Sequence, residues 1–169
     1  MNIEIELSKA SIDNAIAQLK EYERSLNDKN ALFVKKLAEI GIDVVEQRIN
    51  DADGADNTYH DNQLKIHSYG DHSEAILSVS GTDILFIEFG SGIHYNPTNP
   101  EHAGEFGYGV GTYPGQTHAF DPEGWWYRDS TGAPHHSYGT RATAPMLNAS
   151  KAIILQIREI AREVYGSSI

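Results

Sequence analysis

The sequence has no cysteine and no excess of positive charge. Its 169 residues include 13 Lys and Arg against 24 Asp and Glu, which gives a formal net charge of −11. Without cysteine the chain forms neither disulfides nor thiolate sites, and this composition fits a reducing compartment. Proteins that bind nucleic acid through its phosphates carry a basic surface, so the acidic balance argues against that class.

Long apolar runs are also missing. No run approaches the roughly 18 residues that indicate a transmembrane helix. The first ten residues contain Glu4 and Glu6, whereas a signal peptide begins with a basic region before an apolar one. We therefore expect no membrane segment and no export signal in this chain.

The most distinctive segment is residues 84–146. It contains all six prolines, both tryptophans and five of the eight histidines, but no lysine, and ten of the fifteen glycines lie between Gly90 and Gly139. Connections in compact domains are usually about 4–6 residues long, and far longer ones are functional or disordered. A simple linker would not carry Trp125 and Trp126. We predict that residues 91–142 form an extended arm, which becomes ordered by packing its aromatic side chains on something such as another subunit.

Helical spacing of apolar residues dominates the N-terminal part. Ser8 or Ser11 is an N-cap candidate for a helix over residues 9–27. The polar run Asn27-Asp28-Lys29-Asn30 predicts a break. A second helix is then expected over residues 31–50.

Strand patterns are short. Residues 2–7 alternate apolar and polar side chains, which indicates a half-buried strand. Residues 64–69 and 74–80 predict two further strands, joined by a hairpin turn at Gly70-Asp71. A returning strand is expected at residues 136–141.

Two more helices are expected after the hairpin. Asp83 could cap a short helical turn over Ile84–Glu88. The last helix is predicted over residues 145–164, with Pro145 near its start and Thr143 as a possible cap.

These elements predict an α+β fold, because strands and helices do not alternate strictly. We expect two N-terminal helices, a small antiparallel sheet with a long glycine- and aromatic-rich arm, and a C-terminal helix packed on the sheet. Ile154 and Ile157 should then meet residues such as Leu77. The single domain, 1–169, divides into a helical part (8–50), a hairpin core (62–90), the arm (91–142) and the last helix (143–165), and the expected stripe of that helix is Leu147, Ile154, Ile157, Ala161 and Val164.

Histidines and acids on the arm raise the possibility of a metal site. Metal centres need converging ligands, usually at a recognisable spacing such as HExxH, and that spacing is absent. The alternative function that these side chains support is a metal-dependent hydrolase. The candidate residues are His94, His102, His118, His135 and His136, with Glu101, Glu105 and Asp121.

Other motifs of the arm favour structure over chemistry. Ser91 does not stand in the G-x-S-x-G pattern of a nucleophilic serine. We expect the glycines around it to reverse the chain after the short helix. The tryptophans could stack on sugar rings, which gives a second alternative, a glycan-binding module that uses Trp125 and Trp126. The commoner reading of such aromatics is a hydrophobic anchor or a subunit contact.

Three motifs together resemble a known family. Glu88-Phe89-Gly90-Ser91-Gly92 looks like an E-[FY]-G-[ST]-G signature that follows a hairpin, and residues 120–127, FDPEGWWY, resemble a GWWY-type element. Residues 141–149, RATAPMLNA, resemble the start of that family's last helix. The family is the tail-completion group of long-tailed phages and prophages, also called tail-component or neck proteins.

The resemblance implies a virion protein rather than an enzyme. Such proteins look like subunits of a ring in the neck or at the head-proximal end of the tail, where they help to join the head to the tail. The implied partners are further copies of the chain and neighbouring neck and tail proteins, with no cofactor, no catalytic residue, no specific nucleic-acid binding and no membrane. DNA could pass through the ring. The implied location is the virion, and during assembly the host cytoplasm. The residues that we expect to make contacts are Phe89, Trp125, Trp126, Tyr127 and Pro145.

Overall fold

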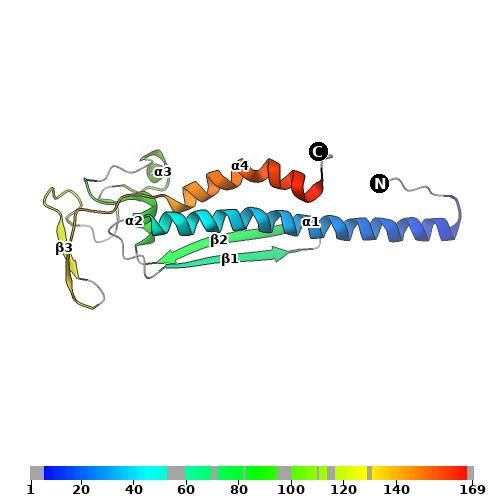
Figure 1. Cartoon of the computed structure of the whole chain (residues 1–169), viewed down its shortest axis with the longest axis horizontal. Coiled ribbons are helices and arrows are strands. Elements are labelled where there is room, and N and C mark those ends of the chain that lie inside the picture. Colours follow the sequence, from blue (N-terminus) through cyan, green and yellow to red (C-terminus); the bar gives the residue numbers. More distant parts are fainter. Residues whose placement is uncertain are drawn as a thin grey trace.

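One helix, α1, runs along most of the computed structural model (Figure 1). It spans Lys9–Asn50, 42 residues, or about 63 Å at 1.5 Å per residue. The Ser8 hydroxyl accepts a hydrogen bond from the Ser11 N–H at 3.2 Å, which confirms Ser8 as the N-cap.

The structure describes residues 6–52, 60–69, 72–81, 83–94, 100–109, 111–113, 117–128 and 131–166. The strand expected over residues 2–7 lies almost wholly outside these ranges, as does the turn at Gly70-Asp71. None of the helices in the described residues is long and apolar enough to cross a membrane.

The prediction of two N-terminal helices is wrong, because α1 continues through Asn27–Asn30. This run contains neither glycine nor proline, and each of its residues costs at most about 0.7 kcal/mol in a helix relative to alanine. Asn30 is also used by the fold, since its Oδ1 accepts a hydrogen bond from the Tyr165 hydroxyl at 2.6 Å. A tertiary contact therefore holds the segment where local propensity predicted a break.

The predicted hairpin is confirmed and is longer than expected. Strand β1 spans His60–Ser68 and pairs antiparallel with β2, Ser73–Gly81. Leu64 lies opposite Leu77, so both side chains share one face of this two-stranded sheet. Leu77 packs against the core, so this face is the inner one.

The arm contains regular elements of its own. The short helix predicted after the hairpin is confirmed as α2, which ends just before the arm. The returning strand predicted over residues 136–141 is β4, which begins and ends earlier in the chain. At the end of the predicted strand, Thr140 makes only an isolated bridge with Ser91. The elements are α2 (Ile84–Phe89), α3 (Pro100–Glu105), β3 (Trp125–Arg128) and β4 (Pro134–Ser137), and β3 pairs antiparallel with β4.

The last helix, α4, spans Pro145–Tyr165, as predicted, with Pro145 in its first turn. The prediction of Thr143 as its cap is wrong. The N-cap is Ala144, in the left-handed conformation at φ 50°, and the Thr143 hydroxyl instead donates to the Arg48 carbonyl at 2.7 Å.

Helix α4 packs mainly on α1 and not on the sheet, which corrects the predicted arrangement. Figure 1 shows α4 and the β1–β2 hairpin on different sides of α1. Ile154 is 63% exposed and Ile157 is 43% exposed, so the expectation that they cover the sheet is wrong. The core forms where α1, α2, β2 and α4 meet, and its members are Val45, Ile49, Ala52, Ile87 and Ala149, with Val44, Leu77, Val79, Ile84 and Met146 around them.

Gly41 of α1 lies at a point that side chains of both α4 and β2 approach. A Cβ atom at this position would stand 2.8 Å from Cδ1 of Ile153 in α4 and 3.2 Å from Cδ2 of Leu77 in β2. Because Gly41 has no side chain, Ile153 and Leu77 can both occupy the space beside it. We infer that this glycine, which is unfavourable inside a helix, is retained for close packing.

We predict that Gly41→Leu lowers the free energy of unfolding by about 1–3 kcal/mol, since a side chain there overpacks the contact between Ile153 and Leu77. Urea unfolding followed by circular dichroism measures the change. The matched control is Ala17→Leu on the exposed part of the same helix, which should change stability by less than about 0.5 kcal/mol. Equal effects of the two substitutions would contradict the packing role.

Candidate functional site

The carboxylate of Glu88 joins three segments of the chain. Its Oε2 accepts a hydrogen bond from the Met146 N–H at 2.8 Å, and its Oε1 accepts one from the Leu147 N–H at 3.1 Å. Nε2 of His102, from α3, lies 2.9 Å from the same Oε1. Glu88 itself is only 7% exposed. We call Glu88, His102 and the first turn of α4 the arm junction.

The arm junction supplies the cap that α4 lacks locally. The first N–H groups of a helix have no acceptor within the helix, and the N-cap residue Ala144 makes no side-chain cap bond. A carboxylate is favoured at this end of a helix by the helix dipole as well as by the hydrogen bonds. Glu88 therefore caps α4 from a different element, 58 residues away from Met146 in sequence.

Backbone contacts bring the two elements together. The Thr143 and Ala144 N–H groups donate to the Ile87 carbonyl at 2.9 Å and 3.2 Å, so the chain enters α4 alongside α2. Gly92, at φ 77°, lies so close to the returning chain that a Cβ atom would stand 2.6 Å from the Tyr138 carbonyl oxygen. Gly90 has φ 80°, which confirms that these glycines supply the left-handed conformation needed for the reversal.

An aromatic cluster fixes the arm against α2. Phe89 is 8% exposed, and its ring centroid lies 5.2 Å from that of His102 and 4.7 Å from that of Tyr108. The Tyr113 hydroxyl donates to the Gly90 carbonyl at 2.6 Å. These contacts order this part of the arm within the subunit itself.

The five predicted contact residues fall into two groups. Phe89 and Pro145 are buried within the subunit, where they pack the arm junction. Trp126 is 71% exposed and Tyr127 is 42% exposed, whereas Trp125 is half-buried. Only the group on β3 is placed for contact with another molecule, and its role as an anchor stays a prediction.

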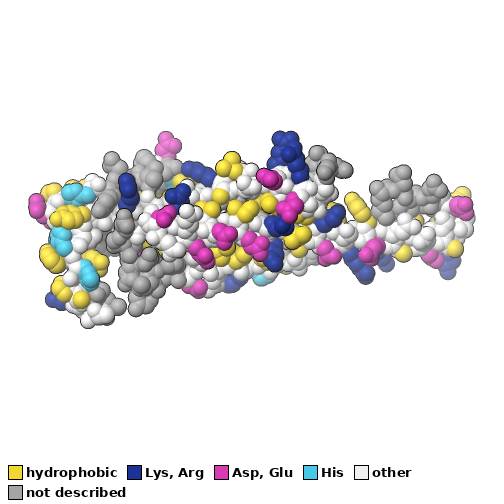
Figure 2. All heavy atoms as spheres, in the orientation of Figure 1, with side chains coloured by type: hydrophobic (Ala, Val, Ile, Leu, Met, Phe, Trp, Pro, Cys, Tyr) yellow, Lys and Arg dark blue, Asp and Glu magenta, His cyan; other side chains and the backbone are white. Residues whose placement is uncertain are grey.

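The β3–β4 hairpin, which we call the aromatic hairpin, brings its aromatic side chains into contact with histidines, edge to face for Trp126 and His136 and stacked for Tyr127 and His135. The Trp126 and His136 centroids are 5.0 Å apart, and those of Tyr127 and His135 are 5.5 Å apart. Figure 2 shows histidine and hydrophobic side chains gathered at the end of the molecule that β3 occupies in Figure 1. This end presents an amphipathic ring surface of the kind found at protein interfaces.

The arm histidines are dispersed. His102 lies in the arm junction, and His94 is 2.8 Å from the Pro122 carbonyl. Two others contact rings of the aromatic hairpin. Among the described residues, no group of three or more possible ligands could hold a metal ion. Ser91 is buried, and its hydroxyl accepts the Thr140 N–H at 3.0 Å, which gives it a structural role.

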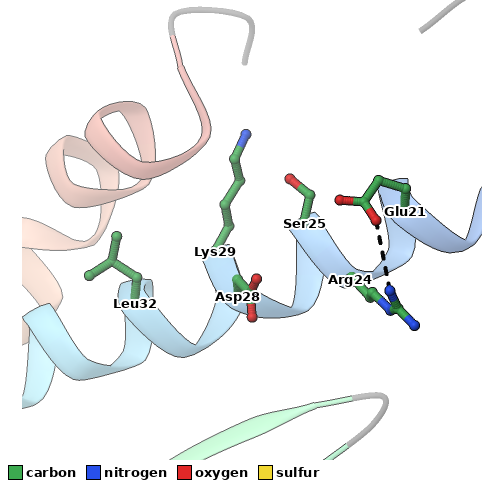
Figure 3. A pocket seen from close by; sticks show the side chains of 6 residues that line it. All are labelled: Glu21, Arg24, Ser25, Asp28, Lys29 and Leu32. Atoms are coloured by element: carbon green, nitrogen blue, oxygen red, sulfur yellow. Dashed lines mark ion pairs between the residues drawn. The ribbon is translucent and has the colours of Figure 1, made fainter. Parts of the chain in front are cut away.

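A hollow of about 460 Å³ lies elsewhere, on the N-terminal half of α1. Its described lining residues all come from this one helix, and Glu21 and Arg24 form an exposed pair at 3.9 Å. Figure 3 shows Lys29 and Ser25 projecting side by side without meeting at a common point. Side chains that diverge in this way form no catalytic arrangement. The lining residues are Glu21, Arg24, Ser25, Asp28, Lys29 and Leu32.

Sequence reasoning did not identify the pairing at the arm junction. Glu88 and His102 are 14 residues apart. The sequence marked Glu88 as part of a family motif and His102 as a possible metal ligand, but did not pair them. A usable signal was present, because a helix that begins at Ala144-Pro145 has no local capping side chain and needs a distant acceptor.

We predict that Glu88→Ala lowers the free energy of unfolding by about 2–4 kcal/mol, since two part-buried N–H groups lose their acceptor. Glu88→Gln, which keeps one oxygen, should cost less. Denaturant unfolding measures both. Glu105→Ala removes an exposed acid of the same arm and should change stability by less than about 0.5 kcal/mol; a Glu88→Ala protein as stable as this control would disprove the capping role.

A second prediction concerns alkaline pH. Burial, with a smaller contribution from Tyr108, raises the pKa of Tyr113 from 10.0 to about 12. The protonated form is therefore favoured in the folded state, so this contribution to stability is fully present below pH 10 and is lost as the pH rises through about 12. Tyr113→Phe should flatten this part of the stability–pH curve, whereas Tyr138→Phe, at an exposed ring, should not. Parallel curves for wild type and Tyr113→Phe would contradict the prediction.

Comparisons with known proteins assign no family to the chain. No protein-family model, no curated protein and no solved structure matches it. The resemblance to phage tail-completion proteins therefore depends on the three motifs alone, and the function is argued from the geometry of the subunit.

Proposed function

We propose that the chain is a structural subunit of a phage virion, which joins head and tail, or completes the tail, by assembling into a ring in the neck or at the tail end. The observation that carries this proposal is the exposure of apolar side chains at both ends of an elongated subunit. The aromatic hairpin stands at one end, with Trp126 71% exposed. The N-terminal half of α1 stands at the other, with Leu19 and Tyr22 each 52% exposed.

Exposed apolar surface at separate places is typical of a subunit that neighbouring molecules complete. Monomeric proteins rarely leave such surface open, because its burial is the main favourable term in association. A subunit with contacts at two ends can bind a different neighbour at each end, which is the arrangement that rings require.

Two of the three motifs that carry the resemblance contact each other in this chain. Glu88, of the first motif, caps the helix that the third motif begins. Gly90 and Gly92 allow the chain to turn between them. This arrangement supports a structural reading of the motifs, since each residue has a role in folding that needs no catalysis.

The acidic balance suits a ring around DNA. A net charge of −11 repels the phosphate backbone, so a genome could slide through without binding. On this proposal the chain acts in the virion, and in the host cytoplasm during assembly.

A glycan-binding module is the second candidate, because the exposed Trp126 ring could stack on a sugar. A glycan array tests it, and binding that Trp126→Ala abolishes would support it. The metal-dependent hydrolase stays an alternative that the sequence suggests. Among the described residues, no group of three or more possible ligands could hold its metal ion.

We predict that Trp126→Ala impairs tail joining and leaves folding intact. The side chain is exposed, so its loss should change the free energy of unfolding by less than about 0.5 kcal/mol, whereas truncating an interface anchor costs about 2 kcal/mol or more of binding. A complementation assay for head–tail joining, paired with thermal unfolding of the free subunit, separates the two effects. Trp125→Ala, at the half-buried neighbour, should lower stability more.

The control for this assay is Arg128→Ala, at the end of the same strand, which should join tails normally. Full tail joining by Trp126→Ala would remove the anchor role. Gene neighbourhood tests the proposal as a whole, because a neck protein should be encoded between capsid and tail-tube genes; a setting among sugar-processing genes would favour the glycan reading.

A further inference from the structure

The N-terminal half of α1 carries largely exposed side chains, and Ala15 is its one buried residue among those described. Helix α4 ends where the Tyr165 hydroxyl meets Asn30, and Figure 1 shows α1 continuing alone beyond both α4 and the β1–β2 hairpin. The segment 9–29 is about 30 Å long at 1.5 Å per residue. In proteins most helical stability comes from tertiary packing of an amphipathic face, so a partner is expected.

The exposed face of this segment continues the face that α4 covers. Phe33 contacts the Tyr165 ring at 5.7 Å under the end of α4. The same heptad spacing runs back from Phe33 to Leu26, Leu19 and Ile12, with Ile16 between the last two. We call Ile12, Ile16, Leu19 and Leu26 the α1 stripe; these side chains are 39–52% exposed.

A second uncovered stripe lies on α4. The buried face of α4 carries Ala149, which leaves a flanking line of Leu147, Ile154, Ile157 and Ala161 that we call the α4 stripe. Its central members, Ile154 and Ile157, are 63% and 43% exposed. These four residues belong to the five-residue stripe that the sequence predicted as the inner face; the fifth, Val164, is half-buried.

The two stripes match in length. Ile12 and Leu26 are 14 positions apart, as are Leu147 and Ala161, so each stripe covers two heptads, or about 21 Å. Two helices with stripes of this length can pack side by side along their whole apolar faces.

Charge also permits the contact. The segment 9–29 contains four acidic and four basic residues, so it is neutral within a chain of net charge −11, and two copies can meet there without net repulsion. Glu23 occupies a heptad position within the α1 stripe, where a buried acid needs a cation. Arg158 and Lys151 flank the α4 stripe on the helix and can provide one.

We propose that the α1 stripe of one copy docks on the α4 stripe of the next copy. This inference rests on the proposed ring function and names the surfaces that build the ring. The contact is heterologous, since each copy offers one surface to each neighbour, and heterologous contacts form a ring when the rotation between copies closes. Pairing of two α1 stripes would give only a dimer and would leave the α4 stripe uncovered.

The test uses two double variants of the full chain. Ile16→Glu with Leu19→Glu disables the α1 stripe, and Ile154→Glu with Ile157→Glu disables the α4 stripe. Because all four side chains are exposed, both proteins should keep the wild-type unfolding midpoint. Sedimentation velocity across a concentration series measures self-association.

We expect wild type to self-associate and each double variant to do so at least about tenfold more weakly. An equimolar mixture of the two variants should form a one-to-one complex and nothing larger, because only one intact contact is possible between them. An α4-stripe variant that self-associates like wild type would overturn the proposal and indicate pairing of α1 stripes. Wild-type protein that stays monomeric at roughly millimolar concentration would also overturn it.

The matched controls are Ala17→Glu on α1 and Leu155→Glu on α4, which add the same charge at exposed positions off the stripes and should associate as wild type does. Failure of the docking proposal is distinct from failure of the proposed function. A ring built through other surfaces would leave the complementation result intact, whereas docking in solution could be observed even in a protein with no role in tails.

Discussion

The buried carboxylate of Glu88 is the contact on which the arrangement of the C-terminal half depends. It accepts the Met146 and Leu147 N–H groups at the start of α4 and lies within hydrogen-bond distance of His102 on the arm. A helix with an alanine N-cap has unsatisfied donors, and a buried donor without an acceptor costs about 1–3 kcal/mol. The same side chain thus fixes where α4 begins and where the arm leaves α2, so the direction of α4 along α1 follows from it.

Helix α1 provides the second constraint, because both other layers pack on it. Gly41 lets Ile153 and Leu77 approach from different elements, so a residue that is unfavourable in a helix makes room for both side chains. The length of α1 exceeds what these layers cover. The packed C-terminal half therefore holds the fold together, while the N-terminal half presents a continuation of the same apolar face to solvent.

The elongated subunit and its exposed ends give the structural proposal its physical basis. Side chains of the two ends differ in kind: rings in contact with histidines at the aromatic hairpin, and aliphatic side chains at heptad spacing on α1. Different surfaces suit different neighbours, as in an assembly that joins unlike parts of a particle. Within the described residues, polar groups are used for capping and for chain reversal, and the hollow on α1 is lined by side chains that diverge.

The sequence by itself determined the α+β class, the β1–β2 hairpin, the short helix before Gly90 and the extent of α4, because these follow from side-chain period, proline and glycine, which act locally. Tertiary structure decided the rest. Asn27–Asn30 stays helical because Tyr165 binds Asn30, and Glu88 caps a helix that begins far along the chain. Helix α4 has two apolar sides, and the more aliphatic one was predicted to be inside; the structure instead buries Ala149, whose small side chain permits close approach to α1. The spacing of apolar residues shows that a helix has an apolar face, but only the shape of its neighbour decides which face is buried.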